Sequence, residues 1–86
     1  MNDKKTSDRS ILVIDDERTV LDSLVKMLKK SQYSCITATN AEDGIRLFAR
    51  ERPLLVLSDL YMPNHKDGIQ VLEEVRRIDP DAVLIL

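Results

Sequence analysis

Four short apolar runs alternate along the chain with segments whose apolar residues recur at helical spacing. The runs are "ILVI" (11–14), "CITAT" (35–39), "LLVLS" (54–58) and "AVLIL" (82–86). Short, continuous apolar runs between polar segments are typical of strands buried on both faces of a parallel sheet. The run at 35–39 is a weaker candidate because half of its residues are polar. The pattern therefore predicts four strands.

Three amphipathic helices are predicted between these strands. The first carries apolar residues at positions 20, 21, 24, 25 and 28 and runs to about Lys30. The second begins at Asn40, whose side chain lies three residues before Asp43 and can cap the helix, and it ends before Pro53. The third carries apolar residues at positions 69, 72, 75 and 78 and ends at the "DPD" that starts at residue 79.

Strands that alternate with amphipathic helices indicate an α/β fold with a doubly wound parallel sheet, right-handed crossovers and helices on both faces. The chain has 86 residues, which suffices for one small domain. Residues 1–9 show no apolar periodicity, and we expect them to form a flexible N-terminal tail. The predicted domain therefore covers residues 10–86.

The composition argues against several classes of function but does not indicate a particular one. The formal net charge of −2 gives no electrostatic argument for direct binding to nucleic acid or to an anionic membrane. No apolar stretch approaches the roughly 20 residues of a membrane span, and the polar N-terminus lacks a signal-peptide core, so we expect a cytoplasmic protein. Cys35 is the single cysteine and cannot form an intramolecular disulfide; we expect a buried thiol without a redox role.

Acidic residues end two of the predicted strands. Asp15 and Asp16 follow the first strand, and Asp59 ends the third. Binding sites of open parallel sheets form at the carboxyl ends of strands, near the point where the strand order reverses. If these two strands are neighbours, three carboxylates converge and repel one another unless a cation lies among them. Such oxygens suit Mg²⁺, and a carboxylate beside the ion can act as a nucleophile toward a phosphoryl group.

A simpler interpretation of these acids is helix capping. An aspartate after a strand often accepts hydrogen bonds from the free N–H groups of the next helix. This interpretation suits Asp16 or Asp59 when each is taken alone. The combination of both with Asp15, on two strands of one parallel sheet, favours the metal and phosphoryl site.

Several segments resemble the response regulator receiver domain, the phosphoacceptor module of two-component signalling. They are "ILVIDDE" (11–17), "LSDLYMP" (57–63), "DG" (67–68) and "AEDGIRLFAR" (41–50). The resemblance extends from Ile11 to Leu86. It implies a flavodoxin-like (βα)5 fold, of which this chain would lack the last helix–strand–helix portion.

The resemblance also assigns roles to single residues. Asp59 would be the phosphorylated aspartate, Asp16 would bind Mg²⁺ directly and Asp15 would bind it through water. The carbonyl of Tyr61 would complete the protein ligands. The implied function is to accept a phosphoryl group from a phosphohistidine of a sensor histidine kinase or a phosphotransfer protein. Slow hydrolysis of the acyl phosphate would follow, so the domain would be a phosphoacceptor with weak self-catalysis and not an enzyme.

The sequence departs from the family pattern in two places. "MPNHKDG" (62–68) has three residues between Met-Pro and Asp-Gly where family members usually have two. The hydroxyl residue expected after the fourth strand, and the lysine and aromatic residue expected on a fifth strand, do not occur among these 86 residues. We expect the run at 82–86 to form an exposed edge strand, and the chain to be a fragment that alone is unstable or self-associates through that strand.

Two other functions remain open at this point. One is a truncated or degenerate receiver domain that acts only as a protein-interaction module. The other is a haloacid-dehalogenase-like phosphatase, which also uses an aspartate nucleophile and Mg²⁺. That family requires the pattern D-x-D after its first strand, whereas Asp15 and Asp16 are adjacent, and 86 residues leave no room for a cap domain.

Overall fold

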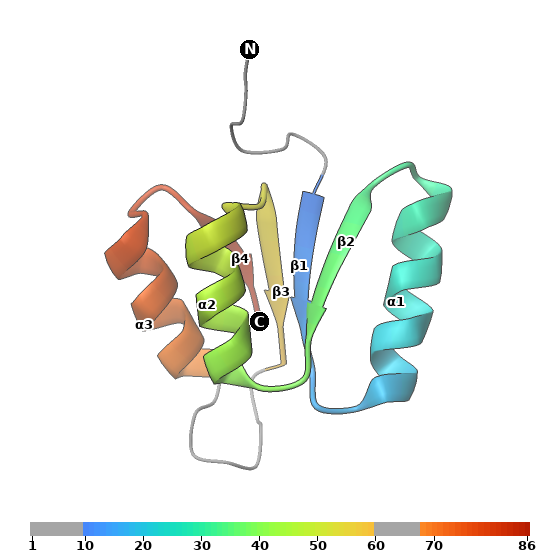
Figure 1. The fold of residues 1–86 in the computed structure, drawn as a ribbon, viewed down its shortest axis with the longest axis horizontal. Coiled ribbons are helices and arrows are strands. Elements are labelled where there is room, and N and C mark those ends of the chain that lie inside the picture. The colour runs from blue at the N-terminus through green and yellow to red at the C-terminus, as the bar shows by residue number, and fades with distance from the viewer. Residues whose placement is uncertain (1–9, 60–67) are drawn as a thin grey trace.

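The computed structural model describes residues 10–59 and 68–86, in which four strands alternate with three helices (Figure 1). The elements are β1 (Ser10–Ile14), α1 (Arg18–Lys30), β2 (Ser34–Ala38), α2 (Ala41–Glu51), β3 (Leu55–Ser58), α3 (Gly68–Ile78) and β4 (Val83–Ile85). All seven predicted elements are present, close to their predicted bounds. The predicted tail at 1–9 and the segment 60–67 lie outside the described residues.

The strands form one parallel sheet in the order β2-β1-β3-β4. The chain moves from β1 to one neighbour, β2, and then crosses to the other neighbour, β3. The strand order therefore reverses between β1 and β3, which is where open parallel sheets place their binding sites. This arrangement confirms the predicted doubly wound fold and makes the strands that end in acids direct neighbours.

Helices α2 and α3 cover one face of the sheet and α1 lies against the other (Figure 1). On the α2/α3 face, Leu12, Ile14 and Val56 pack with Phe48 of α2 and Val75 of α3, and all five side chains are at most 1% exposed. Successive strand residues point to opposite faces, so the neighbouring residues of β1 point toward α1. The central strand β1 is consequently buried on both faces.

Helix α1 covers only part of its face of the sheet and leaves the side chains of β4 exposed. Helix α1 packs against β1 and β2. Two rows of paired residues cross this face from β2 to β4: Cys35, Ile11, Leu55, Val83 and Thr37, Val13, Leu57, Ile85. Ile11 and Val13 are 3% and 1% exposed, but Val83 and Ile85 are 54% and 53% exposed. We call the surface formed by Leu55, Leu57, Val83 and Ile85 the open face.

The beginning of α2 confirms the predicted cap. The Asn40 side-chain oxygen accepts a hydrogen bond from the Asp43 N–H at 2.8 Å, and its Nδ2 donates to the Asp43 carboxylate at 3.1 Å. The helix ends at Glu51, and its C-cap residue Arg52 adopts a left-handed conformation (φ 47°) immediately before Pro53. Helix α1 differs, because its N-cap residue, Glu17, makes no side-chain capping bond.

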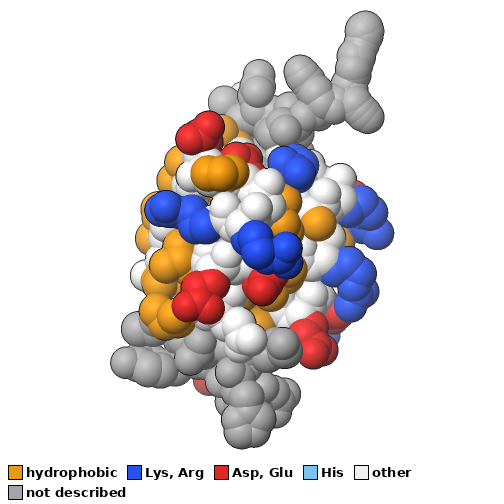
Figure 2. Space-filling view, turned by 90° about the vertical axis from the view of Figure 1, so that its left-hand side faces the viewer, with side chains coloured by type: hydrophobic (Ala, Val, Ile, Leu, Met, Phe, Trp, Pro, Cys, Tyr) orange, Lys and Arg blue, Asp and Glu red, His pale blue; other side chains and the backbone are white. Residues whose placement is uncertain are grey.

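Surface properties of the described residues agree with the composition. Acidic and basic side chains are interspersed on the side of the molecule where α3 lies (Figure 2). No helix in the described part of the chain is long and apolar enough to cross a membrane. Cys35 is half-buried, less than expected, because β2 is an edge strand. Burial raises the pKa of the Cys35 thiol, and the nearby positive charge of Lys29 offsets part of that rise.

Candidate metal and phosphoryl site

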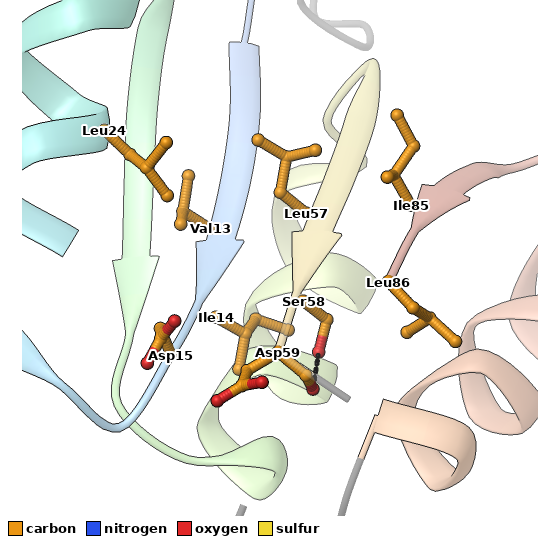
Figure 3. A pocket seen from close by; sticks show the side chains of 9 residues that line it. All are labelled: Val13, Ile14, Asp15, Leu24, Leu57, Ser58, Asp59, Ile85 and Leu86. Carbon is orange, nitrogen blue, oxygen red and sulfur yellow. Dashed lines mark hydrogen bonds between the residues drawn. The ribbon is translucent and has the colours of Figure 1, made fainter. Parts of the chain in front are cut away.

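The candidate site lies at the carboxyl edge of the sheet, where β1 and β3 end side by side (Figure 3). Ile14 pairs with Ser58, the last residue of β3. Asp15 and Asp59 are the next residues of the two strands, so they leave the sheet at the same level. The parallel register therefore brings together two acids that lie far apart in the sequence.

Backbone hydrogen bonds extend the sheet by one residue at this edge and hold both acids. The Asp15 N–H donates to the carbonyl of Ala38 at 3.1 Å, and the Asp59 N–H donates to the carbonyl of Ile14 at 2.9 Å. The buried Ser58 hydroxyl donates to the backbone carbonyl of Asp59 at 3.1 Å. These bonds fix the main chain from which the two carboxylates project.

Asp16 joins the other two acids, as predicted. One carboxylate oxygen from each of Asp15, Asp16 and Asp59 lies within 4.8 Å of the other two. Asp15 and Asp59 are half-buried and Asp16 is exposed, so an ion from solvent can reach all three. Hard, doubly charged Mg²⁺ prefers oxygen ligands and commonly takes only a few from the protein, keeping several waters. The donor set present here fits that ion.

Helix capping does not account for these acids. Glu17 occupies the N-cap position of α1, and α3 begins only at Gly68, so neither Asp16 nor Asp59 is the N-cap of the helix that follows it. Asp15 does serve the local turn, since its Oδ1 accepts a hydrogen bond from the Glu17 N–H at 2.9 Å. That bond leaves the second oxygen of the Asp15 carboxylate for another partner.

An apolar hollow of about 240 Å³ adjoins the acids on the α1 side of the sheet. Figure 3 shows Val13, Leu24, Leu57 and Ile85 along it, with Asp15 and Asp59 at the end where β1 and β3 stop; Ile14, Ser58 and Leu86 complete the lining. The candidate site thus borders the open face. No local sequence pattern indicates this hollow, because it depends on how far α1 extends across the sheet.

The fourth predicted metal ligand, the carbonyl of Tyr61, lies outside the described residues, as does most of the "MPNHKDG" segment. Gly44 of α2 lies directly against Ile14, a contact that was not predicted from the sequence. Gly44 belongs to "AEDGIRLFAR", but no local pattern marks a contact between a helix and a strand 30 positions away. Such a contact becomes visible only after the elements are packed.

Comparison with known protein families identifies the family to which this chain belongs. The family model described as the response regulator receiver domain matches residues 11–86. The chain therefore belongs to the response regulator receiver domain family, as the sequence motifs predicted.

Solved structures agree with this assignment. A response regulator receiver domain protein from Clostridium thermocellum is 31% identical, with a TM-score of 0.83 over 87% of this chain and 60% of its own. The response regulator protein TrrA from Thermotoga maritima, solved in complex with Mg²⁺-BeF, is 35% identical, with a TM-score of 0.85 over 91% of this chain and 67% of its own.

The N-terminal domain of a response regulator receiver protein from Methanoculleus marisnigri is 37% identical, with a TM-score of 0.75 over 83% of this chain and 56% of its own. The chain thus spans about 60% of the length of the solved proteins it matches. These likenesses confirm the flavodoxin-like receiver fold.

Proposed function

We propose that this chain is the phosphoacceptor part of a two-component response regulator and that Asp59 accepts the phosphoryl group. The observation that carries the proposal is the convergence of Asp15, Asp16 and Asp59 at the strand-order reversal of a receiver fold. Membership of the receiver family and the Mg²⁺-BeF complex of the Thermotoga protein support it. On this basis the donor is a phosphohistidine of a sensor histidine kinase or a phosphotransfer protein.

The proposed chemistry is a group transfer between two side chains. A carboxylate oxygen of Asp59 forms a bond to phosphorus while the P–N bond of the phosphohistidine breaks. The electron pair of that bond stays on the imidazole nitrogen, which then takes up a proton. The product is an acyl phosphate on Asp59, which water later hydrolyses. The domain therefore receives and releases a phosphoryl group in a signalling role and has at most weak catalysis of its own.

The acids divide the remaining work. When bound, Mg²⁺ would offset the negative charge of the phosphoryl oxygens and of the attacking carboxylate. Asp16, the most exposed of the three, would bind the ion directly, and Asp15 would bind it through water while its Oδ1 holds the turn. The carbonyl of Tyr61 would supply a further ligand. The backbone bond from Asp59 to Ile14 would keep the nucleophile at a fixed distance from the two metal-binding acids.

Incubation with acetyl phosphate and Mg²⁺, followed by intact mass spectrometry, tests the proposal. We expect a mass increase of one phosphoryl group that disappears in Asp59→Asn and when Mg²⁺ is removed with EDTA. Asp22→Asn, on the exposed surface of α1, is the matched control and should retain the adduct. An adduct that persists in Asp59→Asn would contradict the assignment of the nucleophile.

The same assay separates the two alternative functions. Turnover of phosphate esters that depends on Asp59 would favour a phosphatase. A folded protein that gives no adduct at any Mg²⁺ concentration would favour a module that only binds partners.

For the location and the partners we propose a cytoplasmic protein that also associates with a second copy of itself through β4. Strand β4 forms one edge of the sheet, and residues 82–86 carry no charged side chain. An edge strand presents unpaired N–H and C=O groups, and charge on it is a common means of preventing pairing with another chain. The β4 edges of two copies can pair with each other about a twofold axis. We therefore propose a second copy of this chain as the partner that binds β4.

A further inference from the structure

Gly44 brings α2 against the end of β1 with no space for a side chain. A Cβ atom placed on Gly44 would lie 2.3 Å from Cδ1 and 2.8 Å from Cγ1 of Ile14. Carbon atoms in favourable contact are about 3.5–4.0 Å apart, so both distances are too short for a methyl group. No described glycine has a positive φ, so Gly44 is required here for close approach and not for an unusual backbone conformation.

Ile14 has little freedom to yield to such a group. Its side chain is 0% exposed and belongs to the core formed with Leu12, Phe48 and Val56. Protein interiors are packed about as densely as organic crystals, so a displaced side chain must displace its neighbours or its own backbone. The position of Ile14 is therefore set in part by the absence of a Cβ at residue 44.

The backbone of Ile14 connects this contact to the acids. The Ile14 carbonyl accepts the hydrogen bond from the Asp59 N–H, and Asp15 is the next residue along the chain. Figure 3 shows Ile14 between Asp15 and Asp59 at the end of the sheet. A shift of Ile14 would therefore move Asp15 and change the bond that places Asp59.

We propose that Gly44 is a positioning residue for the metal site: by letting α2 seat on Ile14, it sets the relative placement of the Asp15 and Asp59 carboxylates. This inference rests on the proposed function for its metal-binding consequence. Gly44 does not touch the ion or the phosphoryl group, and it acts through Ile14. Outer-shell groups that hydrogen-bond to metal ligands commonly change metal affinity by about 10–100-fold when they are mutated. Gly44 acts through packing alone, so we expect an effect at the lower end of that range.

A set of variants tests the inference: Gly44→Ala, Ile14→Val and the double variant, each compared with the unaltered chain. Alanine is the better helix former, so Gly44→Ala would stabilise α2 if the contact with Ile14 did not matter. We expect instead that Gly44→Ala weakens Mg²⁺ binding about tenfold in the folded protein. Ile14→Val removes the Cδ1 atom that lies nearest to the new methyl group, so the double variant should bind Mg²⁺ more tightly than Gly44→Ala alone.

Amide NMR spectra provide the second readout and need no metal. In Gly44→Ala without Mg²⁺, the signals of Asp15 and Asp59 should shift, and the double variant should bring them back toward their original positions. Ala49→Gly is the matched control, because it weakens α2 at an exposed position without approaching Ile14. That variant should leave both acidic amides and the Mg²⁺ affinity unchanged.

Each outcome decides one of the two proposals. Unaltered Mg²⁺ affinity and unaltered amide signals in folded Gly44→Ala would overturn the positioning role, as would a double variant that shows no recovery. If Gly44→Ala does not fold, it is combined with Ile14→Ala, which removes Cγ1 as well as Cδ1. That double variant must fold and bind Mg²⁺, and its failure to do so would overturn the inference. If the unaltered chain binds no Mg²⁺, the proposed function fails, while the metal-free amide shifts still decide the role of Gly44.

Discussion

The two faces of the sheet are built from the same strands but differ in how completely they are covered. On the α2/α3 face, Val56 of β3 is 0% exposed beneath two helices. On the α1 face, Val83 and Ile85 of β4 remain more than half exposed, because the single helix there packs mainly against β1 and β2. An apolar strand residue is therefore buried only where a helix packs over it.

The difference in helix cover between the two faces also explains where the candidate site is located. Its acids follow β1 and β3, whose side chains on the α2/α3 face lie in the closed core, while the adjoining hollow opens toward the α1 face. A site of this kind combines a rigid backbone with access from solvent. The closed core should control stability and the open face should control association.

The largest difference between the faces should appear when large side chains are truncated. Phe48 of α2 lies in the core on the α2/α3 face. Phe48→Ala should lower the free energy of unfolding by about 3–5 kcal/mol, because it leaves a cavity in a dense core. Ile85→Ala, on the open face, should change it by less than about 0.5 kcal/mol. Urea unfolding followed by circular dichroism measures both values. Similar losses for the two variants would contradict the distinction between the faces.

A charge on the open face should act on association more than on stability. Ile85→Lys places a charge on β4 and should shift the chain toward monomer in sedimentation velocity, with little change in its unfolding. Thr37→Lys is the matched control: it lies on the same row of the sheet but on β2, at the opposite edge. If both lysine variants dissociate the assembly, or neither does, β4 is not the contact.

Removing the N-cap side chains of α2 and α1 should produce a smaller difference in stability than the core and surface truncations. Asn40→Ala removes the capping bond to the Asp43 N–H and should cost about 1 kcal/mol of stability. Glu17→Ala removes no capping bond from α1 and should have a much smaller effect, which urea unfolding of the two variants would reveal. A larger loss for Glu17→Ala would show that the N-terminus of α1 is held by a contact of the Glu17 side chain.

Thiol chemistry should show the smallest effect, without a change in stability. Cys35 and Val83 lie on one row of the α1 face, at the covered and the open end. Burial raises the pKa of the Cys35 thiol, so at pH 8 a smaller fraction is thiolate and iodoacetamide should react slowly. A cysteine introduced by Val83→Cys in a Cys35→Ser background should react faster. Equal rates would contradict the difference in cover.

Much of this molecule was predictable from local patterns. The strand at 11–14 and the helix that begins after Asn40 were visible because their periodicity and cap are encoded by neighbouring residues. The meeting of Asp15 and Asp59 followed from the general placement of sites in parallel sheets and was confirmed. The exposed edge strand at 82–86 was also predicted, and the structure confirms it. The contact of Gly44 with Ile14 could not be predicted, because it depends on packing between distant segments.

The central claim is that Asp15, Asp16 and Asp59 hold one Mg²⁺ ion, and thermal unfolding with and without Mg²⁺ tests it most directly. Binding of Mg²⁺ to the folded chain should raise the unfolding temperature, with a stabilisation of about 2.7 kcal/mol when the Mg²⁺ concentration is roughly one hundred times the dissociation constant.

Without metal, Asp16→Asn should unfold at a higher temperature than the unaltered chain because it relieves repulsion among the carboxylates. With Mg²⁺ that order should reverse. Asp22→Asn should follow the unaltered chain. An unfolding temperature that does not respond to Mg²⁺, or responds equally in Asp16→Asn, would contradict the account.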